Sequence, residues 1–425
     1  MKSIMIFAPH PDDEVLMTSG IIENAVIEGN RVKVVILTNG DYGASNKIYG
    51  QIRLSESIDA LTFLGLKIED IVFLGYGDTG MSKEDSFLRK LYYSESDTDI
   101  IKTSVGSQTY GISLNSNPNF ASFKDFHSLL YGTPGDYNKK TIMSDIEAAV
   151  KMNLPDDIYV TSLYDGHSDH STAYLFVVDS IINIKKQIPS YSPKLHESLI
   201  HPVNGDENSW PSREIDPFSI IPFTKPPQLE DLTTLKWESI ESIPVPDNMQ
   251  VVPREFNKKY QAINKYYSQI YAPYYLNSFA KSNEFFWVRD FSNIALNAEV
   301  EVSSENSDYG QLGTKAIDGI RDGYPRYTEK EWVTTGELNG AWIKLSWPMP
   351  QWVKCIVLYD RPNLIDHIEK ATLTFSDGDF IEVGPLTNNG SGDVISFQPK
   401  SITWIKLIIS QASGENIGLS EFEVY

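Results

Sequence analysis

Cysteine is almost absent from this chain, because Cys355 is the only one among 425 residues. An intramolecular disulfide framework and a cysteine-rich zinc site are therefore excluded. No run reaches the roughly 18 apolar residues of a transmembrane helix, so we expect no membrane span. The first apolar run begins almost at Met1, so we also expect no signal peptide, which favours a cytoplasmic location.

The chain also contains few positively charged residues. Lys and Arg number 36 against 57 Asp and Glu, and the formal net charge is −21. Such a chain has few groups to neutralise phosphates, which argues against nucleic acid or an anionic membrane as a partner. Hydrophobic residues make up 41% of the sequence and aromatic residues 12%, which is ample for a globular fold. The length predicts two or three domains.

The N-terminal part alternates apolar runs of strand length with segments of helical periodicity. This alternation predicts a Rossmann-like α/β fold, with a mostly parallel sheet covered by helices on both faces. Ligands of such sheets bind beyond the carboxyl ends of the strands. The expected strands are 3–9, 31–40, 71–75 and 157–163, and the expected helices are 13–29, 51–65, 141–152 and 171–186.

The alternation of strand and helix patterns is interrupted further along the chain. Residues 80–135 are polar and contain Gly and Ser, which indicates an insertion over one end of the sheet. Residues 189–253 hold 11 of the 23 prolines, so regular helix is not expected there. This stretch also contains Trp210 and Trp237, so we expect it to pack on the first domain. Residues 255–280 read as helix broken near Pro273.

After about residue 290, short runs of alternating apolar and polar residues lie between Gly, Asn, Asp and Pro turns. This pattern is typical of an all-β sandwich or jelly roll. We therefore expect two domains, an α/β domain over residues 1–290 and a β-sandwich over residues 291–425.

The stretch "PHPDDE" directly follows the first expected strand. It places His10, Asp12, Asp13 and Glu14 within five residues of one another. Adjacent carboxylates repel each other and are costly to desolvate beside a core, so a bound cation is the obvious way to offset that cost. Glu14 also fits the first turn of the following helix, where the macrodipole favours an acid.

A second cluster, "HSDH", lies in the matching place after the strand expected at 157–163. It contributes His167, Asp169 and His170, so three of the seven histidines fall at two strand-to-helix junctions. Two imidazoles and one carboxylate with an open fourth position are the pattern of a catalytic zinc site. Two helix-capping clusters with incidental histidines are the structural alternative.

The two motifs in this order resemble the PIG-L/LmbE-like family of zinc-dependent N-acetylglucosaminyl deacetylases. One small departure is Ser168, which stands where proline is usual in that family. The resemblance extends over roughly residues 1–290 through further stretches, which are "RLSESIDALTFLGL", "FLGYGDTG", "DFHSLLYGTPGDY" and "KYYSQIYAPYYLNSFAKSNEFFW".

The family resemblance implies a role for each matching residue. The implied metal ligands are His10, Asp13 and His170. Asp12 would be the general base on the attacking water, and His167 would stabilise the oxyanion and protonate the departing amine. Asp169 would orient a histidine. The resemblance also suggests that Arg53 and Asp78 contact the substrate, although an internal salt bridge would explain them equally well.

The C-terminal part resembles the discoidin, or coagulation-factor C-type, family, which includes many carbohydrate-binding modules. The stretches that carry this resemblance are "NIALNAEVEVSSEN", "KAIDGIRDG", "EWVTTGE", "GAWIKLSW", "VLYDRPN" and "NIGLSEFEVY". It implies a structural calcium ion at Asp318 and Glu421, with Asp322 as a third candidate. Hydrogen bonding without an ion is the alternative.

Aromatic residues of the C-terminal part divide into two groups. Trp332, Tyr324 and Tyr327 lie in turn-like sequence, where a ring could stack on a sugar. Residues that we expect in the core are Trp342, Trp347, Trp404 and Cys355. We assign no role to His196, His201 and His367, and we interpret His127 as a hydrogen-bonded loop residue.

Together these features predict an enzyme that removes acetyl from an N-acetylated amino sugar and releases acetate and a free amine. Zinc is the first choice of metal, and another divalent transition metal would suit the same ligands. The open alternatives are an amidase acting on another acylated amino-sugar conjugate, a metal-binding protein without turnover, and a non-catalytic carbohydrate-binding protein. The partner is in each case a carbohydrate or glycoconjugate. A discoidin-like domain would point to an extracellular location, so the compartment stays undecided.

Overall fold

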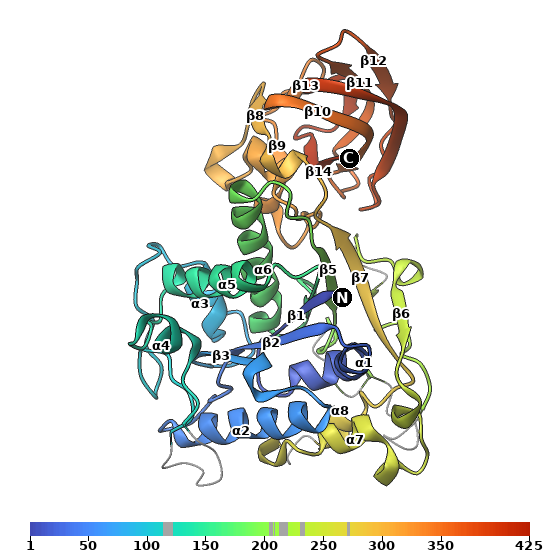
Figure 1. Ribbon diagram of the computed structural model, residues 1–425. Coiled ribbons are helices and arrows are strands. Elements are labelled where there is room, and N and C mark those ends of the chain that lie inside the picture. Colours follow the sequence, from blue (N-terminus) through green and yellow to red (C-terminus); the bar gives the residue numbers. More distant parts are fainter. Residues whose placement is uncertain (114–121, 204–206, 208, 212–219, 230–233, 270–272) are drawn as a thin grey trace. The chain divides into compact units, whose positions relative to one another are not determined.

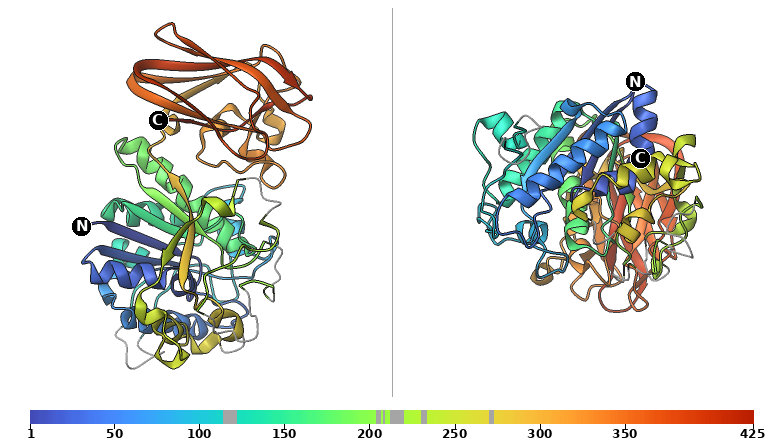
Figure 2. Two further views of the ribbon diagram at one scale, coloured as in Figure 1. Left: turned by 90° about the vertical axis from the view of Figure 1, so that its right-hand side faces the viewer. Right: turned by 90° about the horizontal axis from the view of Figure 1, so that it is seen from below.

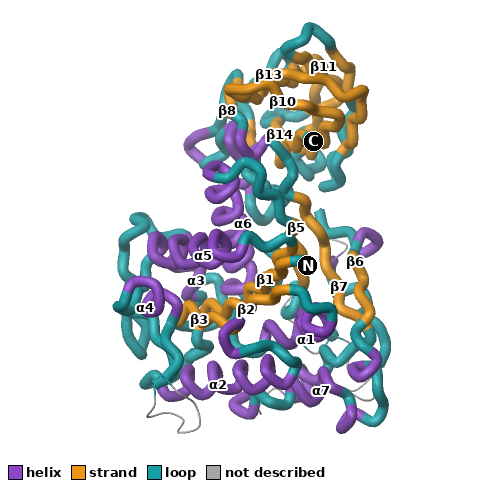
Figure 3. Tube along the Cα trace, viewed as in Figure 1, coloured by secondary structure: helices purple, strands orange, loops and turns teal. Residues whose placement is uncertain are grey.

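The computed structural model describes the chain except for residues 114–121, 204–206, 208, 212–219, 230–233 and 270–272. The chain divides into two compact units, which we describe separately. Unit 1 comprises Met1–Ile181, Pro193–Leu229 and Trp237–Arg289, and unit 2 comprises Ile182–Ser192, Glu230–Lys236 and Asp290–Tyr425. Figure 3 distinguishes the helix-rich N-terminal part from the strand-rich C-terminal part.

Unit 1 is built on a seven-stranded sheet with the order β3-β2-β1-β4-β5-β7-β6. Its first five strands pair in parallel, which confirms the predicted α/β fold. These strands are β1 (Ser3–Ala8), β2 (Arg31–Thr38), β3 (Ile71–Tyr76), β4 (Asp157–Thr161) and β5 (Lys194–Ser198). Strands β6 (Glu241–Pro244) and β7 (Asn283–Asp290) pair antiparallel at one edge.

Helices cover both faces of this sheet (Figure 1), and Figure 2 gives two further views of the same layers. Helices α1 (Asp13–Ile27) and α2 (Ile48–Phe63) lie on one face. Helices α5 (Lys139–Asn153) and α6 (Ser168–Gln187) lie on the other. The chain winds outward from β1 in one direction and from β4 in the other, so the topological switch point lies between these two strands.

Among its described residues, the insertion expected at 80–135 contains two short helices, α3 (Phe87–Tyr92) and α4 (Phe126–Tyr131).

Residues 255–280 form short pieces rather than one broken helix. The described pieces are α7 (Lys258–Ile263), a 3-10 turn at Tyr267–Gln269 and α8 (Pro273–Asn277). Proline at the start of α8 is favourable because the first helical residue needs no N–H partner. Part of the predicted break, residues 270–272, lies outside the described residues.

The proline-rich stretch 189–253 contains strands β5 and β6, neither of which the sequence pattern predicted. It also holds 3-10 turns at Trp237–Ser239 and Asp247–Met249. Trp210 in this stretch is buried and its ring contacts the rings of Phe279 and Phe285. The stretch therefore contributes to the core of unit 1.

Unit 2 contains an antiparallel sheet with the order β12-β11-β13-β10-β14-β9, and β8 pairs with β10. The long strands β10 (Trp342–Asp360) and β13 (Asp393–Ser413) pair over two stretches separated by bulges. The remaining strands are β8 (Glu299–Val302), β9 (Trp332–Val333), β11 (His367–Phe375), β12 (Phe380–Val383) and β14 (Gly418–Val424). These strands enclose an apolar core, and the predicted all-β fold of this part is confirmed.

Several expectations about unit 2 side chains are corrected by their burial. Trp332 is fully buried in β9 and its indole N–H donates to the Ser304 carbonyl, so its ring does not stack on a ligand. Trp347 is in the core as predicted, whereas Trp342, Trp404 and Cys355 are only half-buried. The reason is that side chains alternate between the two faces of a strand, and these three point away from the core.

Among the described residues, no helix combines the length and apolarity that crossing a bilayer requires.

Candidate active site and metal centre

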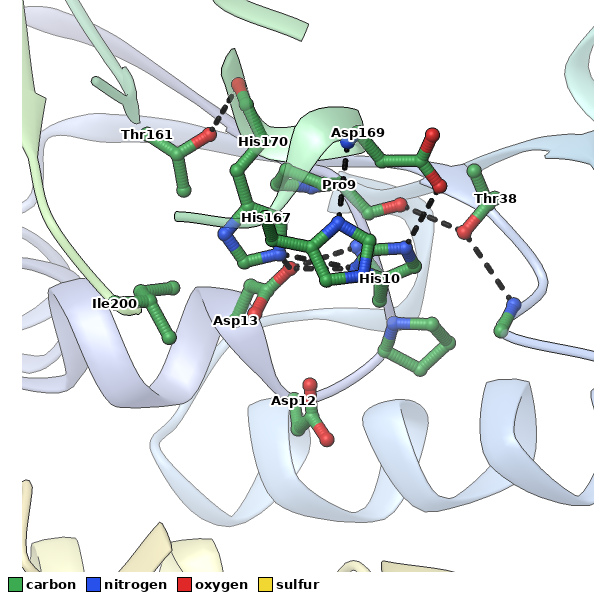
Figure 4. Close-up of polar contacts among 12 residues, drawn as sticks. Pro9, His10, Asp12, Asp13, Thr38, Thr161, His167, Asp169, His170 and Ile200 are labelled. Carbon is green, nitrogen blue, oxygen red and sulfur yellow. Dashed lines mark hydrogen bonds and ion pairs between the residues drawn. The ribbon is translucent and has the colours of Figure 1, made fainter. Parts of the chain in front are cut away.

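Both sequence motifs lie at the carboxyl ends of neighbouring parallel strands. His10 follows β1, Asp13 is the first residue of α1, and His167 and His170 flank the start of α6 after β4. This is the edge of the sheet at the topological switch point, where α/β folds bind ligands. Figure 4 shows the side chains of His10, Asp13, His167 and His170 turned toward one another.

Three of these side chains converge most closely. His10 Nδ1 lies 3.3 Å from Asp13 Oδ2 and 3.1 Å from His170 Nε2. His170 Nε2 is 3.1 Å from the same Asp13 oxygen. Ligand atoms at about 2.0–2.1 Å from a tetrahedral zinc ion are about 3.3 Å apart, so this triangle has the size of three ligands to one ion.

The carboxylates beside the two histidines also fit metal binding. His10 Nε2 lies 3.1 Å from Asp169 Oδ2, and His170 Nδ1 lies 3.2 Å from Asp165 Oδ1. His10 can donate its Nε2 proton to Asp169, while Asp165 lies beside His170 Nδ1 at ion-pair distance, and each ring keeps the lone pair of its other nitrogen for the centre of the triangle. Carboxylates in this position fix the tautomer and raise the basicity of a metal-binding histidine.

The electrostatics of the triangle favour a cation. Burial opposes a charge on His170, but the carboxylates of Asp13 and Asp165 outweigh burial and raise its pKa to about 9. Burial likewise opposes a charge on His10, and Asp78, Asp13 and Asp169 nevertheless hold its pKa well above the usual value. The surrounding potential is thus strongly negative.

Two other donor groups in the described residues share His10. One combines His10, His167 and His170, the other combines His10, Asp78 and Asp169, and in each the ligand atoms lie within 4.8 Å of one another. The triangle with Asp13 has edges of 3.1–3.3 Å, which is the tighter arrangement. We therefore favour His10, Asp13 and His170 as the ligand set.

Asp12 is held in an unusual conformation beside this triangle. Its φ is 122° and its ψ is −33°, in a region that non-glycine residues rarely adopt. Such strain costs about 1–3 kcal/mol and is found at functional sites. Burial raises the pKa of Asp12 to about 7, against the opposing effect of the Arg53 guanidinium. A carboxyl with a pKa near neutrality is suited to general base catalysis.

Arg53 forms the internal salt bridge that was one of its two expected roles. Its Nη2 donates to Asp12 Oδ2 at 3.0 Å and to the Pro11 carbonyl at 2.6 Å, and its Nη1 donates to the Gly40 carbonyl at 3.0 Å. Gly40 has a φ of +59°, and a Cβ there would lie 2.2 Å from Nη1. Only glycine allows the guanidinium to approach this closely.

His167 presents a defined tautomer. Its Nδ1 accepts a hydrogen bond from the Asp169 backbone N–H at 3.1 Å, which leaves Nε2 as the protonated nitrogen of the neutral ring. Burial, together with the nearby rings of His10 and His170, holds the pKa of His167 well below its usual value. A neutral ring that donates through Nε2 can hydrogen-bond to a developing oxyanion.

A cavity of about 200 Å³ opens onto these side chains. Both candidate substrate contacts, Arg53 and Asp78, line it. Asp78 follows β3 and lies 3.8 Å from His10 Nε2. The remaining lining residues are His10, Asp12, Asp13, Leu16, Met81, His167, Ile200, His201, Glu207, Gln269, Tyr275 and Leu276.

The sequence motifs missed several residues of the site. His201, which we gave no role, lines the cavity, with its ring stacked on that of Tyr275 and its Nδ1 2.9 Å from Glu207 Oε1. It follows β5, so its place after a further parallel strand could have predicted it. Asp165 lies two residues before His167, in a loop that carried no recognised pattern.

The expected calcium residues of unit 2 lie close to each other. Glu421 Oε1 accepts a hydrogen bond from the Gly319 N–H at 3.1 Å, beside Asp318. Burial and the Asp318 carboxylate hold the pKa of Glu421 well above its usual value. The proximity of the Asp318 and Glu421 carboxylates suits a cation, and calcium at this place stays a prediction.

Comparison with protein families gives two matches. Residues 5–181 match the PIG-L family, described as GlcNAc-PI de-N-acetylase, and residues 293–425 match a domain family of unknown function, DUF7402. The first match is shorter than the stretch 1–290 over which we noted a resemblance. No curated protein sequence matches the chain.

Solved structures similar to this chain include carbohydrate-binding modules. A fucose-binding module from Streptococcus pneumoniae has 20% identity and a TM-score of 0.28, covering 32% of this chain and 97% of its own. The galactose complex of the family 32 module of Clostridium perfringens NanJ has 20% identity and a TM-score of 0.25, covering 30% and 92%. The lectin domain of lectinolysin, complexed with Lewis B antigen, has 21% identity and a TM-score of 0.26, covering 31% and 95%.

Motif order, fold and the family match agree for the N-terminal part of the chain. The motifs lie where the fold places a ligand site, and the matched range contains every residue of the triangle. Residues 5–181 of this chain form a domain of the PIG-L, or GlcNAc-PI de-N-acetylase, family.

Proposed function

We propose that this protein is a metal-dependent hydrolase that removes the acetyl group from an N-acetylated amino sugar of the N-acetylglucosamine type. The products are acetate and a free amine. The observation that carries the proposal is the triangle of His10 Nδ1, Asp13 Oδ2 and His170 Nε2. Two of its members, His10 and Asp13, line a cavity that Asp12, whose backbone is strained, also lines.

Zinc is the metal that we propose for the triangle, held by His10, Asp13 and His170. When bound, such an ion polarises the amide carbonyl and makes a water molecule more acidic. Asp12 takes the proton from the attacking water, helped by its pKa of about 7. His167 donates from Nε2 to the oxygen of the tetrahedral intermediate. The family resemblance gave protonation of the departing nitrogen to His167, but we assign it to Asp12, because the lowered pKa of His167 favours the neutral ring.

The substitution Asp12→Asn tests the base assignment. It removes the proton acceptor and keeps the shape of the side chain, so we expect acetate release from N-acetylglucosamine oligomers to fall at least ~100-fold. Metal content and melting temperature should stay near those of the parent protein. Turnover equal to that of the parent would refute the assignment.

Two related functions remain to be separated from this one. A panel of N-acetylated and otherwise acylated amino sugars, assayed for amine release, distinguishes the deacetylase from an amidase on another conjugate. A protein that binds metal and carbohydrate without turnover would release no amine from any of them. Elemental analysis of the same sample identifies the transition metal and tests for calcium at Asp318 and Glu421.

A further inference from the structure

The side chain of Asp12 does not explain the strained conformation of its own backbone. Three non-glycine residues in the described part of the chain have a positive φ, and Asp12 has the largest value, 122°. As the N-cap of α1 it makes no side-chain capping hydrogen bond. Such a conformation persists only where the surroundings fix it.

The carboxylate of Glu14 provides one of these restraints. The Asp12 backbone N–H donates to Glu14 Oε2 at 3.0 Å. Reach-back of an acid from the first helical turn to the N-cap N–H resembles a capping box. Glu14 is completely buried, so no water competes for this bond.

The other oxygen of Glu14 is fixed by a residue from a distant part of the chain. Tyr266 Oη donates to Glu14 Oε1 at 2.6 Å, across 252 positions of sequence. Tyr266 is itself buried and lies between α7 and the 3-10 turn that follows. It is outside the range 5–181 that matches the PIG-L family.

Asp12 is therefore restrained from two sides. Glu14 holds its backbone N–H, while Arg53 holds its Oδ2 and the preceding carbonyl of Pro11. Its own carbonyl accepts from the N–H groups of Val15 and Leu16, which begins α1. The orientation of the carboxylate at the cavity depends on all of these bonds together.

We propose that Glu14 and Tyr266 are positioning residues for Asp12. The Tyr266 hydroxyl fixes the Glu14 carboxylate, which fixes the Asp12 backbone in its strained conformation and aims the Asp12 carboxylate at the cavity. This proposal rests on the proposed function of Asp12 as the general base. A purely structural role for the pair would affect stability and leave the reaction step unchanged.

Three variants separate these roles. Tyr266→Phe removes only the hydroxyl and should lower kcat about 10-fold, with KM within about 2-fold, because small misplacements of a reacting group are costly. Glu14→Leu removes both acceptors and should lower kcat about 100-fold. Glu14→Gln keeps an oxygen that can accept from the Asp12 N–H, so it should restore most of the lost kcat.

The matched control is Glu23→Leu, which removes another buried carboxylate from the same helix, one that pairs with Lys258 and Asn248 away from the cavity. It should lower stability and keep the parent kcat per folded molecule. Equal kcat in Glu14→Leu and the parent would overturn the proposal, as would a loss of kcat that merely follows loss of bound metal.

A crystal structure of each variant gives a readout that does not depend on turnover. In Glu14→Leu, Asp12 should leave its positive φ and its carboxylate should turn away from the cavity. An unchanged Asp12 would overturn the proposal even if activity fell. If the parent protein releases no acetate from any substrate, the proposed function fails, while the conformation of Asp12 still tests the role of Glu14.

Discussion

At the scale of single residues, Asp165 connects three parts of the candidate site. Its Oδ1 lies 3.2 Å from His170 Nδ1 and accepts from the His167 N–H at 2.9 Å. Its Oδ2 accepts from the N–H groups of Ile200 at 2.7 Å and His201 at 3.1 Å. One carboxylate thus contacts a ring that we propose as a metal ligand and connects the loop after β4 to the loop after β5.

The substitution Asp165→Asn should weaken metal binding. The amide cannot supply a negative charge to His170 Nδ1 while also accepting from both loops, and loss of such a partner typically lowers metal affinity 10–100-fold. Competition with a chelator measures the change in Kd for zinc. Asp145→Asn is the matched control, because Asp145 is a buried partner of His127 and does not line the cavity. An unchanged Kd in Asp165→Asn would contradict the role.

At the scale of elements, α1 is interrupted where a buried ion pair meets it. Thr18 has a φ of −136° and a ψ of 21°, which breaks the helix. The buried N–H groups of Gly20 and Ile21 donate to the two oxygens of Glu284 at 2.8 and 3.0 Å. Lys259 Nζ neutralises that carboxylate at 2.8 Å. Glu284 of β7 thus accepts from the N–H groups that the break leaves without helical partners, and Lys259 of α7 balances its charge. Both residues come from far along the chain.

Lys259→Met should destabilise unit 1 by about 3–5 kcal/mol, because it leaves the Glu284 charge buried and uncompensated. The double variant Lys259→Met/Glu284→Gln should recover part of this loss, since it removes the charge as well. Chemical denaturation of the parent, both single variants and the double variant measures the free energy of unfolding. Strictly additive losses would mean that the two side chains do not interact.

The contacts of β4 with its neighbour β5 and with the residue before β1 predict sensitivity to acid. Asp157 at the start of β4 contacts Lys2 Nζ at 2.9 Å and His196 Nε2 at 3.0 Å. Burial alone would raise its pKa, but the hydrogen bonds and charges of His196 and Lys2 outweigh burial and lower the pKa to about 2.

The sign of the pH effect follows from this lowered pKa. The ionised carboxylate binds its partners in the folded state, so its stabilisation is complete above the unfolded value of about 3.9 and is lost as the pH falls toward 2. The free energy of unfolding should therefore fall between about pH 4 and pH 2. In Asp157→Asn this fall should be shallower, and equal slopes in parent and variant would exclude Asp157 as a source.

At the scale of the whole molecule, the α/β unit and the β-sandwich suggest a division of labour. Removal of residues 292–425 should weaken binding to an insoluble N-acetylglucosamine polymer more than it lowers turnover of a small soluble substrate. Sedimentation with the polymer and acetate release measure the two effects. A melting curve of the shortened chain checks its folding, because Ile182–Ser192 and Glu230–Lys236 group with unit 2. Equal losses in both assays would argue against a separate binding role.

Local sequence pattern predicted the fold class and most of the parallel sheet of this protein. The alternation of apolar runs predicted β1 to β4 with α1, α2, α5 and α6, since burial on a parallel sheet and on a helix face impose different periods. The two motifs were predicted to meet because the carboxyl ends of parallel strands share one edge. Period alone could not identify β5 and β6, because proline and polar residues obscure the pattern there.

The sequence by itself determined the chemical groups of the site, the strand ends that bear them and the fold class. Only the tertiary structure decided that Asp165, His201 and Tyr266 join those groups, that Asp12 is strained and that Trp332 is buried in a core. The physical reason is that strand and helix periods arise from neighbours in sequence, whereas burial, pKa and hydrogen-bond partners depend on atoms that folding brings from distant parts of the chain.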